Sequence, residues 1–257
     1  MAPAGGKSDA ADLIYGLHAV REALRSGARP IQKLLLVGQD RQYGELFQQA
    51  RAQQIPVRVE PKVAMDRLVP DGRHQGVIAV IAPKEYVQPD SILDTARRRA
   101  EAPFVLLLDG VEDPQNLGAV LRTAEGAGVH GVVIPERRSA RLTGAVARAS
   151  AGAVDHIPVA CVTNLTRQIE QFQKDGLWVY AVDPSAEKLY TALDYRGAVA
   201  LVLGGEGGGI RRGVLAQCDD RVRIPMRGQV ASLNVSAAAA ILCYEVVRQR
   251  HPDATQP

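Results

Sequence analysis

The first segment whose residue types could do chemistry is Asp109–Glu125, DGVEDPQNLGAVLRTAE, which follows an apolar run. It offers an amide at Asn116, which can donate and accept hydrogen bonds, and a guanidinium at Arg122, which can bind an anion. Asn116 stands where a helix N-cap belongs, and Arg122 lies inside the helix expected to start at Leu117. A plain N-cap and a solvated arginine would explain these two residues taken singly.

A glycine-rich segment, Leu203–Ile210 (LGGEGGGI), follows another apolar run, and five of the six residues 204–209 are glycine. Glycines at this density let backbone N–H groups approach a ligand closely. The segment lacks the GK[ST] ending of a P-loop and does not open with G-x-G-x-x-G, so neither common nucleotide-binding turn is present. A plain turn would also fit, and Glu206 is the one residue there that could act chemically.

The third segment, Ile224–Glu245, leaves a strand, crosses a loop and enters a helix rich in small residues. Ser232 and Asn234 flank the start of that helix, so helix capping alone would explain both. No G-x-S-x-G pattern surrounds Ser232 or Ser236, which disfavours an acyl-enzyme mechanism.

Other patterns that resemble binding motifs are excluded by their spacing or by the elements around them. Gly126–Gly131 (GAGVHG) matches G-x-G-x-x-G, but its glycines end a helix and lead into a strand, the reverse of the dinucleotide-binding order. The five histidines are scattered and the three cysteines lack CxxC spacing. We therefore expect no metal site and no disulfide framework, and the cysteine usage suggests a reducing cytoplasm.

From residue 92 onward, apolar strands alternate with helices, as in a mainly parallel sheet covered on both faces. Such sheets bind ligands at the carboxyl ends of their strands, where all three segments stand. The predicted strands are Phe104–Leu108, Gly131–Ile134, Ile157–Val159, Trp178–Val182, Ala198–Leu203 and Arg221–Ile224. The predicted helices are Leu117–Gly126, Thr143–Ala151, Asn164–Lys174, Arg211–Cys218 and Asn234–Arg250.

Residues 1–83 predict a separate small α/β domain, with residues 1–11 expected to be disordered. Residues 84–91 (KEYVQPDS) are polar and predict a linker, in which Asp90 or Ser91 would cap the following helix. Residues 92–257 would form the second domain, ending in a frayed tail at 251–257. The elements predicted in the first domain are helices Leu13–Ser26, Gly44–Gln54 and Lys62–Leu68 and strands Ile31–Val37, Val57–Val59 and Val77–Ile81.

The composition narrows the class of protein. A hydrophobic content of 46% in 257 residues excludes a disordered chain, and the aromatic content of 4% disfavours a base-stacking platform. No run approaches the ~20 apolar residues of a membrane helix, and no secretory signal is visible. The net charge of +3 lies entirely in residues 1–83, with eleven basic and eight acidic residues. Such a surplus fits either a random imbalance or a mild nucleic-acid bias.

Together, the three segments resemble the three motifs of the SpoU (TrmH-like) RNA ribose 2′-O-methyltransferases. The motif N-L-G-A-x-L-R-T-A corresponds to Asn116–Ala124, L-V-L-G-x-E-x-x-G to Leu201–Gly209, and I-P-M-x-G-x-x-x-S-L-N-V-S to Ile224–Ser236. Three long matches in the same order are more specific than a lone glycine motif. Near the N-terminus, Gly16–Val20, Ile31–Val37 and His74–Val77 resemble the RNA-binding domain of the ribosomal-protein-L30e type.

The resemblance implies a small L30e-like N-terminal domain and a trefoil-knotted, mainly parallel α/β methyltransferase domain. It further implies a cytoplasmic homodimer, with the helix Asn234–Arg250 as a candidate part of the interface. The chain looks most similar to the 23S rRNA (guanosine-2′-O-)-methyltransferase subgroup. In the implied reaction, a guanosine ribose 2′-oxygen of large-subunit rRNA attacks the methyl carbon of S-adenosyl-L-methionine.

The family's catalytic positions correspond here to Asn116, Arg122, Glu206, Ser232 and Asn234. Arg122 falls on the arginine proposed to activate the 2′-hydroxyl. Because a guanidinium stays protonated in proteins, Arg122 could instead fix the neighbouring phosphate or stabilise the developing alkoxide.

Cofactor contacts in this family are largely made by backbone, and their positions correspond to Gly204, Ile224 and Leu233. No metal and no membrane are implied. Two alternatives stay open. One is the same chemistry on a tRNA or on an rRNA adenosine, and the other is a non-catalytic RNA-binding protein on this scaffold, against which the intact motif residues argue.

Overall fold

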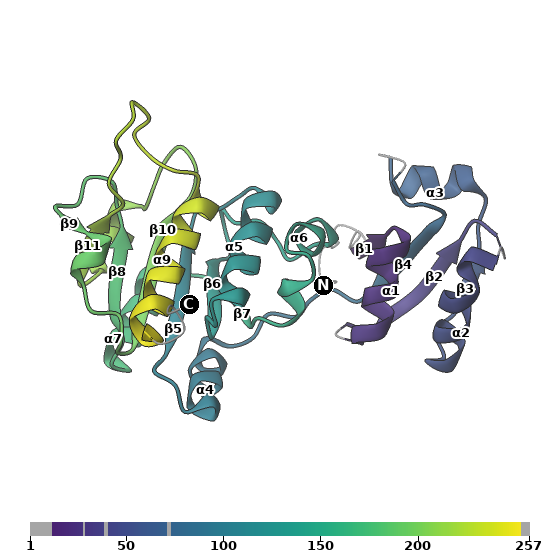
Figure 1. Cartoon of the computed structure of the whole chain (residues 1–257), viewed down its shortest axis with the longest axis horizontal. Coiled ribbons are helices and arrows are strands. Elements are labelled where there is room, and N and C mark those ends of the chain that lie inside the picture. The colour runs from purple at the N-terminus through teal and green to yellow at the C-terminus, as the bar shows by residue number, and fades with distance from the viewer. Residues whose placement is uncertain (1–11, 28, 39–40, 71–72, 253–257) are drawn as a thin grey trace, which may run out of the picture. The chain divides into compact units, whose positions relative to one another are not determined.

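The computed structural model describes residues 12–27, 29–38, 41–70 and 73–252 (Figure 1). The chain divides into two compact units, one of residues 1–84 with 142–144 and one of residues 85–141 with 145–257. The predicted disorder of residues 1–11 concerns residues outside the described part, as does most of the predicted frayed tail. No helix within the described ranges is both long and apolar enough to cross a membrane.

The N-terminal unit is a mixed four-stranded sheet in the order β1-β4-β2-β3. Its central strand β4 is buried on both faces, which explains its unbroken apolar sequence VIAVI. Val77, Ala79 and Ile81 pack into a core with α1 and α2, whereas Ile78 and Val80 pack against α3. The elements are β1 (Asp12–Tyr15), α1 (Leu17–Ser26), β2 (Ile31–Leu36), α2 (Gly44–Ala52), β3 (Val57–Val59), α3 (Lys62–Leu68) and β4 (Val77–Ile81).

The first helix begins later in the chain than the sequence predicts, at Leu17 rather than at Leu13. Residues 12–15 form β1, in which Leu13 lies opposite Val80 of β4. The helix α1 starts only at Leu17, because Gly16 adopts a positive φ of 91° and turns the chain. Gln75 then accepts a hydrogen bond from the backbone N–H of Leu17 at 3.0 Å, which satisfies one free donor of the helix start.

The second unit is a seven-stranded sheet in the order β7-β6-β5-β10-β8-β11-β9, with every strand pair parallel. Helices α4, α7 and α8 pack into one core on one face, and α5 and α9 lie side by side on the other. The strands are β5 (Phe104–Asp109), β6 (Gly131–Pro135), β7 (Val159–Val162), β8 (Trp178–Val182), β9 (Lys188–Leu189), β10 (Val199–Gly204) and β11 (Asp220–Arg223). The helices are α4 (Pro89–Arg99), α5 (Pro114–Gly126), α6 (Gly144–Ala149), α7 (Leu165–Lys174), α8 (Arg212–Gln217) and α9 (Val235–Arg250).

The predicted α/β class is therefore confirmed, with a small mixed-sheet unit and a parallel sheet. Other local predictions also differ from the structure. The helix α4 begins at Pro89 with Gln88 as its N-cap, so neither Asp90 nor Ser91 caps it, because proline is preorganised for the first helical position. Strand β7 lies at Val159–Val162 rather than Ile157–Val159, and the two-residue strand β9 was not predicted. The trefoil knot stays a prediction of the resemblance.

Candidate functional site

The parallel sheet brings the ends of β5 and β10 together at one edge. Asp109, the last residue of β5, pairs in register with Gly204, the last residue of β10. The segment that follows β5 leads into α5, and the glycine-rich segment follows β10. The sequence order strand, loop, helix thus places both segments at the carboxyl edge, as open α/β sheets place their ligand sites.

Asp109 fastens both ends of the glycine-rich loop. Its backbone oxygen accepts a hydrogen bond from the N–H of Gly205 at 2.8 Å. Its carboxylate, only 1% exposed, accepts from the backbone N–H of Arg211 at 2.8 Å and from the guanidinium Nε at 2.7 Å. A Cβ on Gly205 would lie 1.7 Å from the carbonyl oxygen of Gly110, so only glycine fits there. The sequence analysis did not predict the pair of Asp109 and Arg211, although an aspartate at the end of an apolar strand indicates a functional or structural role.

Three polar side chains from three distant segments form one hydrogen-bonded cluster at this edge. The Asn116 amide donates to Oε1 of Glu206. The Asn234 amide donates to the same oxygen at 3.1 Å and to Oδ1 of Asn116 at 3.0 Å. Residues that are 90 and 118 positions apart in sequence therefore hold one another in fixed orientations.

The two asparagines of this cluster lie at helix starts, in different positions. Asp113, not Asn116, is the N-cap of α5, and it accepts from the N–H of Gln115 at 2.9 Å. Asn116 consequently lies in the first turn of the helix, where it is 9% exposed. Asn234 is the N-cap of α9, as capping preference predicts, and it accepts from the N–H of Ser236 at 2.9 Å. Capping uses the Asn234 oxygen, which leaves its amide nitrogen for the cluster.

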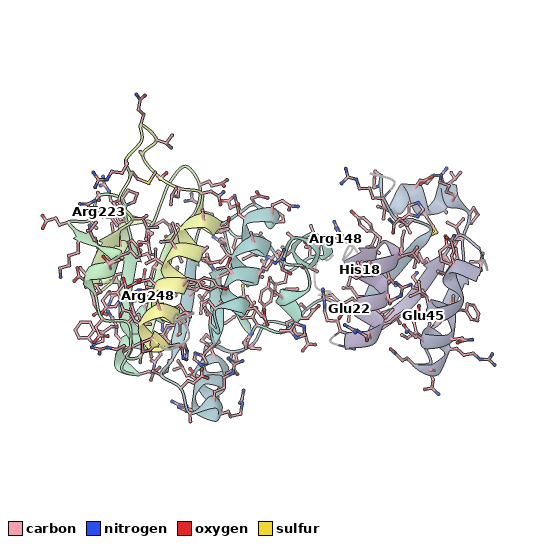
Figure 2. All side chains as sticks on the ribbon, in the orientation of Figure 1. His18, Glu22, Glu45, Arg148, Arg223 and Arg248 are labelled. Carbon is pink, nitrogen blue, oxygen red and sulfur yellow. The ribbon has the colours of Figure 1, made fainter. Side chains whose placement is uncertain are left out.

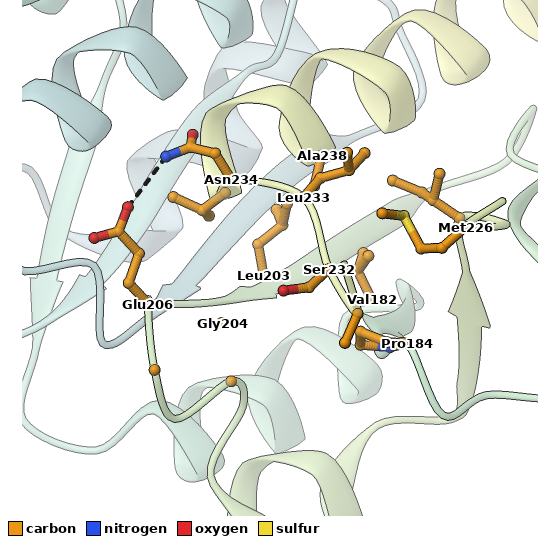
Figure 3. Close-up of a pocket in the computed structure, with 16 residues that line it drawn as sticks. Val182, Pro184, Leu203, Gly204, Glu206, Met226, Ser232, Leu233, Asn234 and Ala238 are labelled. Carbon is orange, nitrogen blue, oxygen red and sulfur yellow. Dashed lines mark hydrogen bonds between the residues drawn. The ribbon is translucent and has the colours of Figure 1, made fainter. Parts of the chain in front are cut away.

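A pocket of about 540 Å³ opens beside the cluster (Figure 3). The Ser232 hydroxyl points into it, and the Glu206–Asn234 hydrogen bond lies at its margin. Among the described residues that line it, only Glu206 has a charged side chain. The predicted site residues that line it are Gly204, Glu206, Ile224, Ser232, Leu233 and Asn234, and the lining residues that the sequence reading did not name include Val182, Pro184, Met226, Ala231 and Ala238.

The structure does not bring Arg122 into this pocket. Arg122 follows Asn116 by six residues on α5, which corresponds to about 9 Å along the helix axis and about 240° around it. Its side chain is exposed, and among the described residues it has no hydrogen-bond or ion-pair partner. Within one chain, Arg122 is therefore a surface cation near the site rather than part of the pocket wall.

Nucleophilic thiol chemistry has no support at this site. Burial raises the pKa of Cys218 and of Cys243 to about 12, and neither residue lines the pocket. The described residues also contain no group of three His, Cys, Asp or Glu side chains that could hold a metal ion. The chemistry available at the pocket is that of oriented amides, one carboxylate and one hydroxyl.

Two protein families match the two units in order along the chain. Residues 103–244 match the SpoU rRNA methylase family, and residues 13–87 match the substrate-binding domain of RNA 2′-O ribose methyltransferases. A Bacillus subtilis protein, YacO, whose name places it among TrmH-family tRNA/rRNA methyltransferases, is 44% identical over 246 residues. That alignment covers 94% of this chain and 97% of the relative.

Solved structures share the fold. The AdoMet-bound rRNA methyltransferase of Sinorhizobium meliloti is 26% identical, with a TM-score of 0.76 over 93% of this chain and 87% of the other. The SpoU methyltransferase AviRb of Streptomyces viridochromogenes, in complex with AdoMet, is 24% identical, with a TM-score of 0.75 over 93% and 90% of the two chains. SpoU methyltransferases that share this fold thus bind S-adenosylmethionine. By these matches, the chain belongs to the SpoU rRNA methylase family.

Proposed function

We propose that this chain transfers a methyl group from S-adenosyl-L-methionine to the 2′-oxygen of a guanosine ribose in 23S rRNA, with release of S-adenosylhomocysteine and of the hydroxyl proton. The single observation that carries the proposal is the cluster of Asn116, Glu206 and Asn234 at the margin of the pocket. The choice of a large-subunit guanosine is supported by the motif resemblance to that subgroup. The family description, which names rRNA, supports the RNA class.

The pocket fits S-adenosylmethionine in size and chemistry. Its volume of about 540 Å³ falls within the ~300–1,000 Å³ of small-molecule sites. Leu203, Ile224 and Met226 offer apolar surface for an adenine and a methionine chain, and the backbone of residues 204–209 offers hydrogen bonds. Gly204, Ile224 and Leu233, the predicted cofactor contacts, all line it. The bound cofactor would supply an electrophilic methyl group.

The residues of this chain would then orient the ribose. Asn116, Glu206 and Asn234 are already held by their mutual hydrogen bonds, so little ordering is needed when the substrate arrives. The Ser232 hydroxyl lies within the pocket and can hydrogen-bond the incoming group. Arg122 is assigned to binding the neighbouring phosphate or the developing negative charge, since a protonated guanidinium cannot accept a proton.

The proposal includes a division of labour and a dimer. Residues 1–83 would grip folded rRNA, residues 84–91 would link the domains, and residues 92–257 would carry the catalytic site. The dimer would use α9, where Tyr244 is 55% exposed on a helix otherwise rich in alanine. In such a dimer, exposed cations of one copy, such as Arg122, would lie close to the second copy.

The test is methyl transfer from labelled S-adenosylmethionine to transcripts of 23S rRNA and, in parallel, to tRNA. The tRNA arm is included because the names of the relatives include tRNA. Wild-type protein should label the rRNA, Arg122→Ala should label it at least tenfold more slowly, and ribose-methylation mapping should find a guanosine. A folded Arg122→Ala protein with the wild-type rate would refute the role of Arg122. Labelling of tRNA alone, or of an adenosine, would refute the substrate assignment.

A further inference from the structure

A short loop after β6 gathers positive charge at the same edge of the sheet as the pocket. Residues 136–141 read Glu-Arg-Arg-Ser-Ala-Arg and contain neither helix nor strand. Arg137, Arg138 and Arg141 are all exposed. The catalytic unit as a whole is close to neutral, so this local excess is not a consequence of its overall composition.

The backbone of this loop is fixed by hydrogen bonds. The N–H of Glu136 donates to the carbonyl oxygen of Val162 at 2.8 Å, and the N–H of Ala140 donates to that of Val111 at 2.9 Å. Arg141 donates back to the carbonyl oxygen of Glu136 at 3.2 Å. Arg138 adopts a φ of 59°, a left-handed conformation that a non-glycine residue keeps only when its surroundings impose it. The loop is therefore a defined support for the two arginines at its tip.

The guanidinium groups of Arg137 and Arg138 have no hydrogen-bond or ion-pair partner among the described residues. Some exposed arginines of this unit are ion-paired with a neighbour in sequence, whereas others, such as Arg122, have no such partner among the described residues. Arg97 pairs with Asp94 at 2.8 Å, and Arg196 pairs with Asp194 at 2.7 Å. Arg248, labelled on α9 in Figure 2, pairs with Glu245 at 2.7 Å. The two loop arginines are adjacent in sequence and unpaired, so both guanidinium groups can bind an external anion.

The loop lies close to the proposed acceptor site. Strands β6, β5 and β10 are neighbours in the sheet, so the end of β6 is about 10 Å from the end of β10 at ~4.8 Å per strand. The hydrogen bond from Ala140 to Val111 joins the loop to the connection that leads into Asn116. A short run of nucleotides leaving the pocket edge could reach the two arginines.

We propose that Arg137 and Arg138 bind phosphates of the RNA strand that carries the methylated ribose. The inference rests on the proposed function and adds a second RNA contact, on the catalytic unit itself. Guanidinium groups bind phosphate oxygens in a bidentate manner, and such contacts position a strand without reading its sequence. The nearby acids Glu112 and Asp113 lie on the neighbouring loop, and Asp113 is occupied by capping α5.

The experiment measures equilibrium binding of the full-length protein to a 23S rRNA transcript at several salt concentrations. Each lost phosphate contact lowers the slope of log K against log salt by about 0.7 for single-stranded RNA. The double variant Arg137→Gln/Arg138→Gln should therefore bind more weakly at low salt, with a slope smaller by about 1.4. Its S-adenosylmethionine affinity, measured by calorimetry, should equal that of wild type.

A matched control removes the same charge elsewhere. Arg97→Gln/Arg196→Gln replaces two exposed arginines that are already ion-paired, and it should keep the wild-type slope. An unchanged slope in the loop variant, or an equal fall in the control, would overturn the proposal. Failure of the proposed function would look different, because wild-type protein would then bind no S-adenosylmethionine and methylate no RNA, whatever the salt dependence of the loop variant.

Discussion

Polar side chains at the two ends of the seven-stranded sheet have different surroundings. At the carboxyl end, Glu206, Ser232 and Asn234 are exposed, stand on or beside loops and line an open pocket. At the amino end, the guanidinium of Arg250 and the ring of His130 instead bond to backbone groups. The same sheet thus presents polar side chains to a pocket at one end and uses polar side chains to hold the backbone at the other.

Arg250 shows how a polar side chain holds the backbone at the amino end. Its guanidinium donates to the carbonyl oxygens of Ala102 at 2.7 Å, Gly197 at 2.6 Å and Tyr195 at 3.0 Å, and it lies 5.4 Å from the ring centre of Phe104. The last turn of α9 is thereby tied to the segments that begin β5 and β10. An arginine with this many backbone partners is a structural group, whereas the unpaired arginines at the other end are available for binding.

The comparison teaches that the two ends should respond differently to mutation. Loss of a group at the carboxyl end should reduce activity with little change in stability. Loss of a group at the amino end should reduce stability with little change in the activity of the molecules that stay folded.

The largest effect is expected for Glu206→Ala. The change removes the acceptor shared by two amides, so the preorganised cluster is lost and methyl transfer should fall by about 10²–10³-fold. The midpoint of thermal unfolding should stay within a few degrees of wild type, because the side chain is exposed. A large fall in that midpoint would break the comparison. Glu206→Gln, which keeps the shape, separates the contribution of the charge.

The next largest effect is expected for Arg250→Met, at the other end. The variant leaves several backbone carbonyls without their donor, and we expect the free energy of unfolding to fall by about 3 kcal/mol. Urea unfolding gives this value, and methyl transfer per folded molecule should be unchanged. A stable but inactive variant would mean that the amino end also serves the reaction.

Arg211→Ala tests a mixed case. Arg211 pairs with Asp109, a buried charge that lies at the carboxyl end, where the pocket opens. The variant leaves that carboxylate with fewer donors, and we expect a loss of about 1–3 kcal/mol, since the Arg211 side chain is 48% exposed and the pair is partly solvated. Activity should fall as well, because the glycine-rich loop that carries Glu206 loses its attachment. Arg212→Ala, next in sequence and exposed, is the control and should change neither property.

The parts of the fold that local pattern determines could be predicted from the sequence. The apolar run Phe104–Leu108 is buried on both faces of a parallel sheet, and such strands leave a continuous hydrophobic signature. The strand at residues 12–15 was missed because its apolar residues continue the spacing of α1. The two residues of β9 are too few to leave any pattern.

The site was predictable in a different way. Side-chain type and local spacing left Asn116, Glu206 and Asn234 as ordinary capping or turn residues, and only the resemblance grouped them. The hydrogen bonds that join them span 90 and 118 positions, and no local pattern reports contacts at that distance. The pair of Asp109 and Arg211, 102 positions apart, was missed for the same reason.

The smallest effect concerns pH and the amino end. His130 is 1% exposed, and burial lowers its pKa below the ordinary 6.5 despite the nearby Glu101. Its Nδ1 accepts from the N–H of Phe104 at 3.0 Å, and its Nε2 lies 3.0 Å from the Glu101 carboxylate. The folded protein therefore favours the neutral ring, and below pH 6.5 the unfolded chain binds more protons than the folded one.

The free energy of unfolding should thus fall as the pH drops below 6.5, by at most about 1.4 kcal/mol per pH unit from this group. The variant His130→Gln removes the titrating ring, so the difference in stability between wild type and variant should shrink on acidification and stay constant above pH 6.5. Urea unfolding at a series of pH values measures it, with the exposed His156→Gln as the matched control. If the stability difference between wild type and His130→Gln did not change with pH, the buried His130 ring at the amino end of the sheet would not be held neutral.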